Sequence, residues 1–238
     1  MIDLYSWPTP NGQKVHIMLE ETGLDYTPIA VDITQGAQFE KDFLAISPNN
    51  RIPALLDHDG PGGAPFSVFE TGAMLIYLAE KSGQFMPTDD RQCSVVLQWL
   101  MFQMGGVGPM FGQQSHFNNY APKIAGEAEI AYGQQRYDNE VARLYAVIDN
   151  RLVESEYLGG PDYSIADMAT FPWVRGHRRR HIQIDEFPHF QRWLEAMKAR
   201  PAVRRGIDLL GDHSGRLNKG LDEKAIDNLF GQTQFQRR

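Results

Sequence analysis

The sequence predicts an α/β domain followed by an all-helical domain. Strand-like and helical patterns alternate over roughly the first third of the chain, and no convincing strand pattern follows Pro87–Asp90. The chain has 238 residues, which at about 150 residues per domain fits one large domain or two small ones. We therefore place the α/β domain at residues 1–86 and the helical domain at 87–210, with a polar tail or extension at 211–238.

The first domain is expected to contain its elements in the order βαβ, short helix, ββα. In the first helix, apolar residues recur at i, i+3 and i+4, and Gly23 supplies a stop. The parallel crossover of the βαβ unit should be right-handed. The expected strands are Ile2–Ser6, Tyr26–Ile33, Ala54–Asp57 and Phe66–Phe69. The expected helices are Asn11–Gly23, Phe39–Ile46 and Thr71–Ser82.

The second domain is expected to be helical throughout. The run Gly105–Pro109 interrupts its first helix and matches neither the dinucleotide fingerprint nor the Walker loop. We interpret this run as a helix kink. Ser164 and Asp167 form a capping box, which predicts the start of a buried helix. The expected helical ranges are 92–104, 127–154, 165–180 and 190–200, with a short piece after Pro201.

Charge and hydropathy exclude several classes of function. With 23 basic and 30 acidic residues the net charge is −7, which disfavours nucleic-acid binding. The basic run Arg175–His181 is isolated, so we interpret it as a solvated helix end or a set of interface salt bridges. No stretch approaches about 18 consecutive apolar residues, so no membrane span is expected. The N-terminus lacks the features of a secretory signal, which favours the cytoplasm.

The cysteine and histidine content argues against metal or disulfide chemistry carried by the chain itself. Cys93 is the only cysteine, which excludes an intrachain disulfide, a two-cysteine redox motif and a cysteine-rich metal site. His177 and His181 stand at i, i+4, but no third ligand has a suitable spacing. We expect no metal site, and we expect Cys93 to be an inert thiol.

The segment Pro8–Gly12 lies between the first strand and the first helix. A helix N-terminus presents unsatisfied N–H groups and a partial positive charge. Thr9 and Asn11 can donate further hydrogen bonds there, so a thiolate at this position would be stabilised. The alternative is that Asn11 only caps the helix.

Pro53 stands at the start of a strand, where it cannot donate to the hydrogen-bond ladder. A cis Ile52–Pro53 bond would turn the Ile52 backbone outward to pair with an extended peptide ligand. Because cis X-Pro bonds are rare, at about 5–6%, the pattern alone leaves both isomers open.

Glu70 and Thr71 precede and open a predicted helix. The backbone N–H groups at Thr71 can bind a ligand carboxylate, and Glu70 can hold a ligand ammonium. Both charges of an amino-acid head group would then be matched within one turn. The alternative is simple helix capping.

Taken together and in order, these segments resemble the glutathione transferase superfamily. Within it they are similar to the bacterial nu class, which includes glutathione-dependent disulfide-bond oxidoreductases. The resemblance covers about residues 1–205. The segments that carry it are Pro8–Gly12, Ser47–Ala54, Phe69–Ala73 and the run from Gln98 to Gln113.

The resemblance implies a thioredoxin-like domain followed by a helical-bundle domain, usually as a homodimer, with glutathione as co-substrate and no metal. It implies that Thr9 and Asn11 contact the glutathione sulfur as the catalytic residues, and that the Ile52 backbone pairs with the cysteinyl unit ahead of a cis Pro53. The other implied glutathione-binding residues are Glu70 and Thr71 at the γ-glutamyl head, Gln38 and Arg51 near the glycyl end or carboxylates, and Arg136, which would reach the neighbouring subunit's glutathione.

The resemblance also implies the reaction, in which a glutathione thiolate reduces disulfides or organic peroxides and conjugates electrophiles weakly. The expected partners are a small disulfide, peroxide or electrophile and a second copy of the chain, with neither nucleic acid nor a membrane. One alternative is a detoxifying transferase that prefers carbon electrophiles. Another is a non-catalytic interaction module, because fold does not fix function. Trp7 is bulky for its position and would narrow the electrophile pocket.

Overall fold

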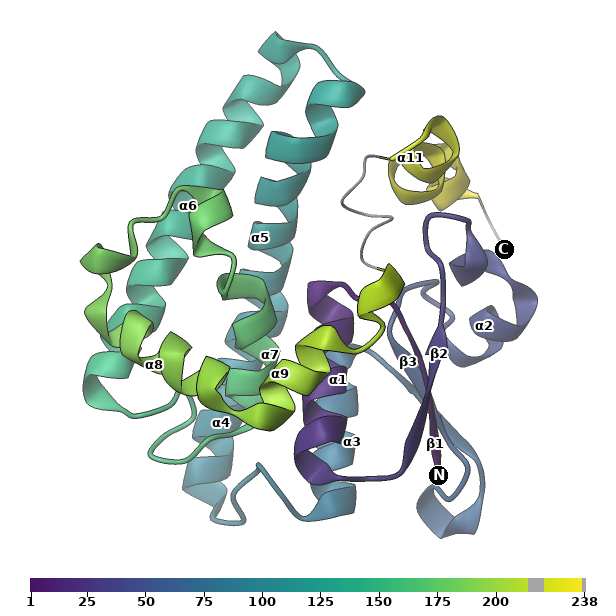
Figure 1. Ribbon diagram of the computed structural model, residues 1–238, viewed down its shortest axis with the longest axis vertical. Helices are drawn as coiled ribbons and strands as arrows, with labels where there is room; N and C mark the ends of the chain where they lie inside the picture. Colours follow the sequence, from purple (N-terminus) through teal and green to yellow (C-terminus); the bar gives the residue numbers. More distant parts are fainter. Residues whose placement is uncertain (214–220, 237–238) are drawn as a thin grey trace. The chain divides into compact units, whose positions relative to one another are not determined.

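The computed structural model describes residues 1–213 and 221–236, so residues 214–220 and 237–238 of the predicted tail lie outside the described part. The chain divides into two units (Figure 1), one made of Met1–Ser82 with Pro201–Arg238 and the other of Gly83–Arg200. The described residues after Arg200 thus group with the first unit although they follow the second in the sequence. The boundaries expected at residues 86 and 210 stay a prediction.

A four-stranded mixed sheet forms the centre of the first unit, in the order β2-β1-β3-β4. β1 runs parallel to β2, whereas β3 is antiparallel to both β1 and β4. Figure 1 shows α1 and α3 to one side of the sheet and α2 to the other. The strands are β1 (Ile2–Ser6), β2 (Tyr26–Ala30), β3 (Ala54–Asp57) and β4 (Phe66–Phe69). The helices flanking the sheet are α1 (Pro10–Thr22), α2 (Lys41–Ile46) and α3 (Thr71–Ser82).

The register of the sheet determines which loops meet. Ala54 of β3 pairs with Tyr5 of β1 on one side and with Phe69 of β4 on the other. The end of β1, the start of β3 and the end of β4 therefore lie at one edge of the sheet. The segments that follow β1, precede β3 and follow β4 extend from that same edge.

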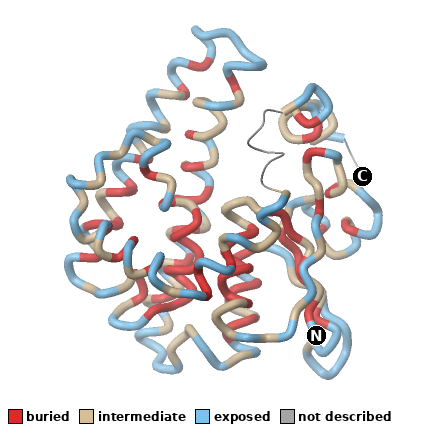
Figure 2. Tube along the Cα trace, in the orientation of Figure 1, coloured by how far each residue is buried: buried red, intermediate tan, exposed pale blue. Residues whose placement is uncertain are grey.

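Helix α1 is buried along most of its length (Figure 2), with an unbroken run of buried residues from Gly12 to Leu19. It begins because the Thr9 hydroxyl accepts a hydrogen bond from the Gly12 N–H at 3.2 Å and Pro10 occupies the first turn. It ends at Gly23, which adopts a left-handed conformation with φ of 67°. Both α3 and α9 (Pro201–Asp208) pack against it.

The C-terminal part of the described chain docks onto the loop that follows β2. The Asn228 side chain on α11 (Glu223–Phe230) donates from Nδ2 to the Thr34 carbonyl at 2.9 Å. Gln38 in turn donates from Nε2 to the Asn228 carbonyl at 3.4 Å. The remaining short helical turns of this unit are η1 (Ala37–Phe39), η2 (Pro61–Gly63), η8 (Gly211–His213) and η9 (Gln232–Phe235).

The second unit is helical in all its main elements, as expected. The regular α-helix is interrupted at the run Gly105–Pro109, as expected, but by a helical turn of another type rather than by a loop. A π-helical turn, η3 (Gln103–Val107), links α4 to α5 and accommodates Pro109 in the first turn of α5. The helices are α4 (Asp90–Phe102), α5 (Gly108–Ser115), α6 (Glu127–Glu154), α7 (Ile165–Val174) and α8 (Pro188–Ala199). The shorter turns are η4 (His116–Tyr120), η5 (Ala121–Lys123), η6 (His177–Arg180) and η7 (Ile184–Glu186).

The capping box at the start of α7 is structural, as predicted. Asp167 is fully buried, and its carboxylate accepts from the Ser164 N–H and hydroxyl at 3.0 Å each. The same carboxylate accepts from the Leu158 N–H at 2.9 Å and from Trp193 Nε1 at 2.8 Å. Burial raises the pKa of Asp167, and these donors oppose that shift by stabilising the charged form. Helix α7 ends at Val174 rather than near Arg180.

The α/β-plus-helical fold class predicted from the sequence is confirmed. The first unit has a thioredoxin-like arrangement of strands and helices, and the second is a helical bundle. No helix in the described ranges combines the length and apolarity needed to cross a lipid bilayer.

Gly206 provides a test of the α1–α9 packing. A Cβ at Gly206 would lie 2.7 Å from the Ile17 backbone, so we expect Gly206→Ala to lower the free energy of unfolding by about 1–3 kcal/mol through overpacking. Gly211→Ala is the control, because nothing lies within 4 Å of its Cβ position. Urea unfolding measures both, and equal stability of the two variants would contradict this packing.

Candidate functional site

Thr9 and Asn11 lie at the N-terminus of α1. Thr9 is the N-cap, so the alternative that Asn11 only caps the helix is wrong. The Thr9 hydroxyl accepts from the Gly12 N–H, which leaves its own proton to donate to another group. A Cβ at Gly12 would lie 2.2 Å from the Trp7 carbonyl oxygen, so only glycine permits this close return of the preceding loop. Two polar side chains and the positive end of a helix are thus placed together.

The Ile52–Pro53 peptide bond is cis. The loop before it is held by a hydrogen bond from the Ser47 hydroxyl to the Arg51 carbonyl at 2.8 Å. The Ile52 side chain packs against an apolar cluster that includes Phe43 and Ala54. This packing anchors the residue at the start of β3.

Glu70 and Thr71 follow β4. Glu70 is exposed and has a φ of 69°, an uncommon conformation for a residue other than glycine. Such conformations concentrate at functional sites. Thr71 is buried and is the first residue of α3. Asn49 donates from Nδ2 to the Glu70 carboxylate at 3.5 Å, which connects this segment to the loop before Pro53.

The structure brings these segments together. Because Tyr5, Ala54 and Phe69 are paired in register, the loops that carry Thr9, Ile52 and Glu70 leave the same edge of the sheet. A helix N-terminus, an extended backbone segment and a second helix N-terminus therefore share one edge. This combination can bind an extended, anionic peptide.

Gln38 and Arg51 differ in their surroundings. The Gln38 side chain is buried, and its Oε1 atom has no hydrogen-bond partner among the described residues. Arg51 is exposed, and its guanidinium donates to the Asn50 carbonyl at 3.2 Å and also to the Asn50 side chain. Gln38 is therefore held by a distant part of the chain, whereas the printed hydrogen bonds of the Arg51 guanidinium within the described residues go to its neighbour Asn50.

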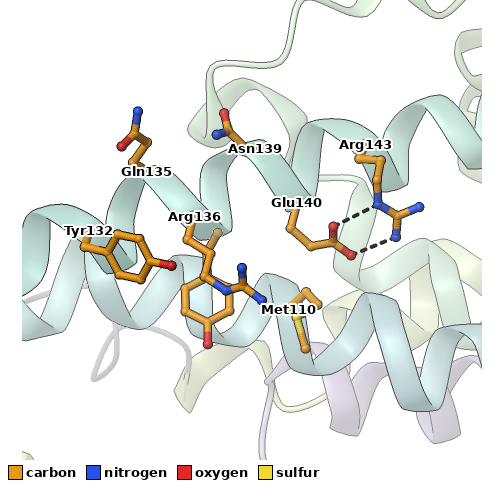
Figure 3. A pocket seen from close by; sticks show the side chains of 8 residues that line it. Met110, Tyr132, Gln135, Arg136, Asn139, Glu140 and Arg143 are labelled. Carbon is orange, nitrogen blue, oxygen red and sulfur yellow. Dashed lines mark hydrogen bonds and ion pairs between the residues drawn. The ribbon is translucent and has the colours of Figure 1, made fainter.

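Arg136 belongs to the second unit, on α6, where it lines a pocket of about 520 Å³ (Figure 3). Further along the same helix, Glu140 pairs with Arg143 at 2.8 Å. That hydrogen-bonded pair, helped by the charge of Arg136, lowers the pKa of the Glu140 carboxyl. The pocket is lined by Met110, Tyr132, Gln135, Arg136, Tyr137, Asn139, Glu140 and Arg143.

Sequence reasoning missed Lys14, whose side chain lies beneath the start of α3. The residue is 1% exposed, and its Nζ donates to the Thr71 hydroxyl oxygen at 3.2 Å. Burial lowers the pKa of Lys14 to about 7, and the charge of Glu70 partly opposes this shift. The sequence did contain an indication of this burial. Lys14 precedes the apolar residues Ile17 and Met18 by three and four positions, which places all three on the same face of the helix.

A second buried polar group on α1 was also missed. His16 is fully buried, with Nε2 2.8 Å from the Ser6 hydroxyl and Nδ1 3.2 Å from the Gly206 carbonyl. Because a carbonyl only accepts, we assign the ring proton to Nδ1 and the Ser6 hydroxyl as donor to Nε2. Burial lowers the pKa of His16 to about 4, so the ring is neutral at pH 7. Because both side chains are fully buried, the hydrogen bond between Ser6 and His16 stabilises the fold and does not form a nucleophile–base pair.

Trp7 and Cys93 belong to different units. Trp7 is 1% exposed, and its ring centroid lies 4.8 Å from that of His213. Its predicted effect on the substrate range stays a prediction. Cys93 is partly exposed on α4. Across residues 1–213 and 221–236, no three metal-ligating side chains cluster into a metal site.

Comparison with known protein families gives two matches. Residues 1–80 match the family model described as Glutathione S-transferase, N-terminal domain, and residues 120–201 match Glutathione S-transferase, C-terminal domain. The Escherichia coli protein named Disulfide-bond oxidoreductase YfcG is 49% identical over 208 residues, covering 87% of this chain and 94% of that protein. Disulfide-bond oxidoreductase YghU of the same organism is 38% identical over 236 residues, covering 94% of this chain and 79% of that protein.

Solved structures give the same result. A glutathione transferase from Burkholderia graminis, with two glutathione molecules bound per subunit, has a TM-score of 0.81 and 49% identity, and covers 87% of both chains. A glutathione transferase from Pseudomonas putida, with one glutathione disulfide bound per subunit, has a TM-score of 0.81 and 46% identity. That match covers 87% of this chain and 91% of the P. putida chain.

Replacement of Lys14 by methionine should stabilise the ligand-free protein. The folded pKa of about 7 lies below the ordinary value of 10.5, so the unfolded chain binds this proton more tightly. The cost of burying the charge is fully present below about pH 7 and declines as the pH rises toward 10.5. Lys14→Met should therefore have a higher free energy of unfolding than wild type at about pH 7.5. Between about pH 7.5 and pH 9 this difference should shrink by about 2 kcal/mol, at roughly 1.4 kcal/mol per pH unit.

Urea unfolding of both proteins across this pH range measures the effect. Lys41→Met, at an exposed lysine of the same unit, is the matched control and should show no such trend. A stability difference between Lys14→Met and wild type that does not change with pH would rule out a titrating buried ammonium.

Proposed function

Because the chain belongs to the glutathione S-transferase family, we propose that it uses glutathione to reduce disulfides. The support is of two kinds. Two relatives, at 49% and 38% identity, are named disulfide-bond oxidoreductases, and similar solved structures carry glutathione or its disulfide. The single observation that favours the proposal in this chain is the meeting of three ligand-binding segments at one sheet edge.

Each segment then takes one part of the tripeptide. Thr9 and Asn11 donate to the sulfur, the Ile52 backbone pairs with the cysteinyl unit, and Glu70 with Thr71 binds the γ-glutamyl head. The α1 N-terminus adds its positive potential to these donors and stabilises the thiolate. In this proposal residues 1–86 are the glutathione-binding domain.

The remaining predicted contacts complete the proposal. Gln38 and Arg51 lie near the glycyl end or the carboxylates, and Arg136 reaches the glutathione of the neighbouring subunit in a homodimer. The support for Arg136 is its place in the pocket on α6, with an exposed guanidinium. The protein acts in the cytoplasm.

The chemistry needs no cysteine from the protein. The bound thiolate attacks one sulfur of a small disulfide, forming a mixed disulfide and releasing the other sulfur as a thiolate that takes up a proton. A second glutathione, also as its thiolate, attacks the glutathione sulfur of the mixed disulfide. The products are two substrate thiols and glutathione disulfide, so glutathione supplies both electrons. The same thiolate reduces organic peroxides and conjugates electrophiles more weakly.

Loss of the donors at the sulfur should slow the reaction. Thr9→Ala and Asn11→Ala should each lower kcat/KM for reduction of bis(2-hydroxyethyl) disulfide roughly tenfold to a hundredfold, because each removes one hydrogen bond to the developing thiolate. Thr9→Ser keeps the hydroxyl and should retain most activity. The measurement is the rate of glutathione disulfide formation, with circular dichroism to confirm folding. Wild-type rates in both alanine variants would refute these roles.

Cys93 should be dispensable. Cys93→Ser should keep the wild-type rate of disulfide reduction, since glutathione supplies both thiols. The same assay measures this variant. A Cys93→Ser protein that folds but no longer turns over would show that the chain's own thiol enters the reaction.

A further inference from the structure

The C-terminal residues 221–236 have no role in the function as proposed so far. We propose that their helix, α11, belongs to the glutathione site, and that Asn228 is a positioning residue which holds the loop after β2 in the shape that receives the glycyl end of the tripeptide. This loop comprises residues 31–38. The inference rests on the proposed function, because it assigns the recognition of one part of glutathione.

Asn228 holds the loop at two points. It is 7% exposed, and its Nδ2 donates to the Thr34 carbonyl at 2.9 Å. Its backbone carbonyl accepts from Nε2 of Gln38 at 3.4 Å and also from the Gln234 side chain. Because a carbonyl can only accept, this contact fixes which way the Gln38 amide is turned. One residue of α11 therefore holds both ends of the turn between Thr34 and Gln38.

Gly36, midway between these two points, lies against the Asn228 side chain. Its φ of 88° is in the left-handed region, which glycine adopts at little cost. A Cβ at this position would lie 3.3 Å from the Asn228 Oδ1 atom, so the turn and the helix fit closely. A substitution at Gly36 can therefore test the same contact from the side of the loop.

The docking of α11 involves one face of the helix and more than one hydrogen bond. Ala225 and Asn228, three positions apart, are its buried residues. The Ala225 N–H donates to the Asp222 carboxylate at 2.8 Å, which caps the helix. At the exposed rim, Nζ of Lys224 donates to Oε1 of Gln35 in the loop at 3.0 Å. The helix is therefore held on the loop in a defined orientation.

Strand register places this loop beside the other ligand-binding segments. β2 runs parallel to β1 with Ser6 paired to Ala30, and the Val31 N–H donates to the Ser6 carbonyl at 2.9 Å. The loop after β2 therefore leaves the same edge of the sheet as the loop after β1, which carries Thr9.

The order of the strands gives the direction of the proposed ligand. In the sheet order β2-β1-β3-β4, the γ-glutamyl segment follows β4 and the cysteinyl segment precedes β3. A tripeptide bound in this order is directed from β4 across β3 toward β1 and β2. Neighbouring strands are about 4.8 Å apart and an extended residue spans about 3.4 Å, so the glycyl end is directed to the β2 side of the edge. The loop that Asn228 holds extends from that side.

A second contact connects the C-terminal part of the chain to the sulfur segment. The His213 ring packs against the Trp7 ring, with 4.8 Å between the ring centroids. The Trp7 carbonyl accepts from the Thr9 N–H at 2.7 Å, so this contact lies just before a proposed sulfur donor. Described residues after Asp208 thus contact two loops of the ligand-binding edge, the one after β1 and the one after β2.

The test compares two ligands that differ only in the glycyl residue, S-methylglutathione and S-methyl-γ-glutamylcysteine. Neither has an ionisable thiol, and isothermal titration calorimetry measures their affinities. Wild type should bind S-methylglutathione more tightly. Asn228→Ala should weaken binding of S-methylglutathione roughly tenfold and that of the dipeptide by less than about twofold, because only the glycyl end meets the loop. In turnover, Asn228→Ala should raise KM for glutathione and leave kcat at saturation nearly unchanged.

Two glycine variants test the contact from the side of the loop. Gly36→Ala places a methyl group against Asn228 and should cause the same selective loss of affinity for S-methylglutathione. Gly62→Ala is the matched control, because Gly62 also has a positive φ, of 74°, but nothing lies within 4 Å of its Cβ position. This control should bind both ligands as wild type does.

Hydrogen exchange of the wild-type protein tests the inference without any substitution, and so decides it even if Asn228→Ala does not fold. S-methylglutathione should slow the exchange of the α11 amides and the dipeptide should not, because binding at the loop and docking of α11 stabilise each other.

Four results would each overturn the inference. These are equal binding of the two ligands by wild type, wild-type affinity of Asn228→Ala for both, an equal loss of affinity for both in that variant, and faster exchange in α11 on binding. If wild type binds neither ligand, the proposed function is overturned as well.

Discussion

The enclosure of α1 is the constraint on which the rest of the first unit depends. A helix covered by a sheet, by α3 and by α9 has no solvent-facing stripe, and its residues from Gly12 to Leu19 are all buried. Every polar side chain within that run must then find a partner inside the protein. Lys14 finds Thr71, and His16 finds Ser6 and Gly206. The enclosure also fixes the direction of the helix, and so the position of its N-terminus at the sheet edge.

Local signals were sufficient for much of the fold. The βαβ order, the stop at Gly23, and the capping box at Ser164 and Asp167 each depend on residues close in sequence, and all are found in the structure. The glycine-rich run indicated an interruption of the helix, but its residues alone did not specify that a π-helical turn makes this interruption. The grouping of residues after Arg200 with the first unit had no local signal at all.

The candidate site, like the fold, was only partly predictable from local sequence. The residue types of Thr9, Ile52 and Glu70 suggested three separate binding segments, but only strand register places them at one edge. Register depends on pairing between distant strands, which local pattern does not specify. Gln38 illustrates the limit, since its partner Asn228 lies 190 positions away. Lys14 was missed for a different reason, because a lysine on a helix is normally assumed to reach water.

The contact of α9 with α1 has a consequence for how the protein is made. The face of α1 that receives Gly206 belongs to residues near the start of the chain, and its cover comes from Pro201–Asp208. At about 5–20 residues per second, a ribosome needs roughly ten to forty seconds to extend the chain from one to the other. The first unit can complete its core only after the second has been synthesised. During that interval the carbonyl groups of Ile207 and Gly206, which accept hydrogen bonds from the Gln13 and His16 side chains in the folded protein, have not yet been made.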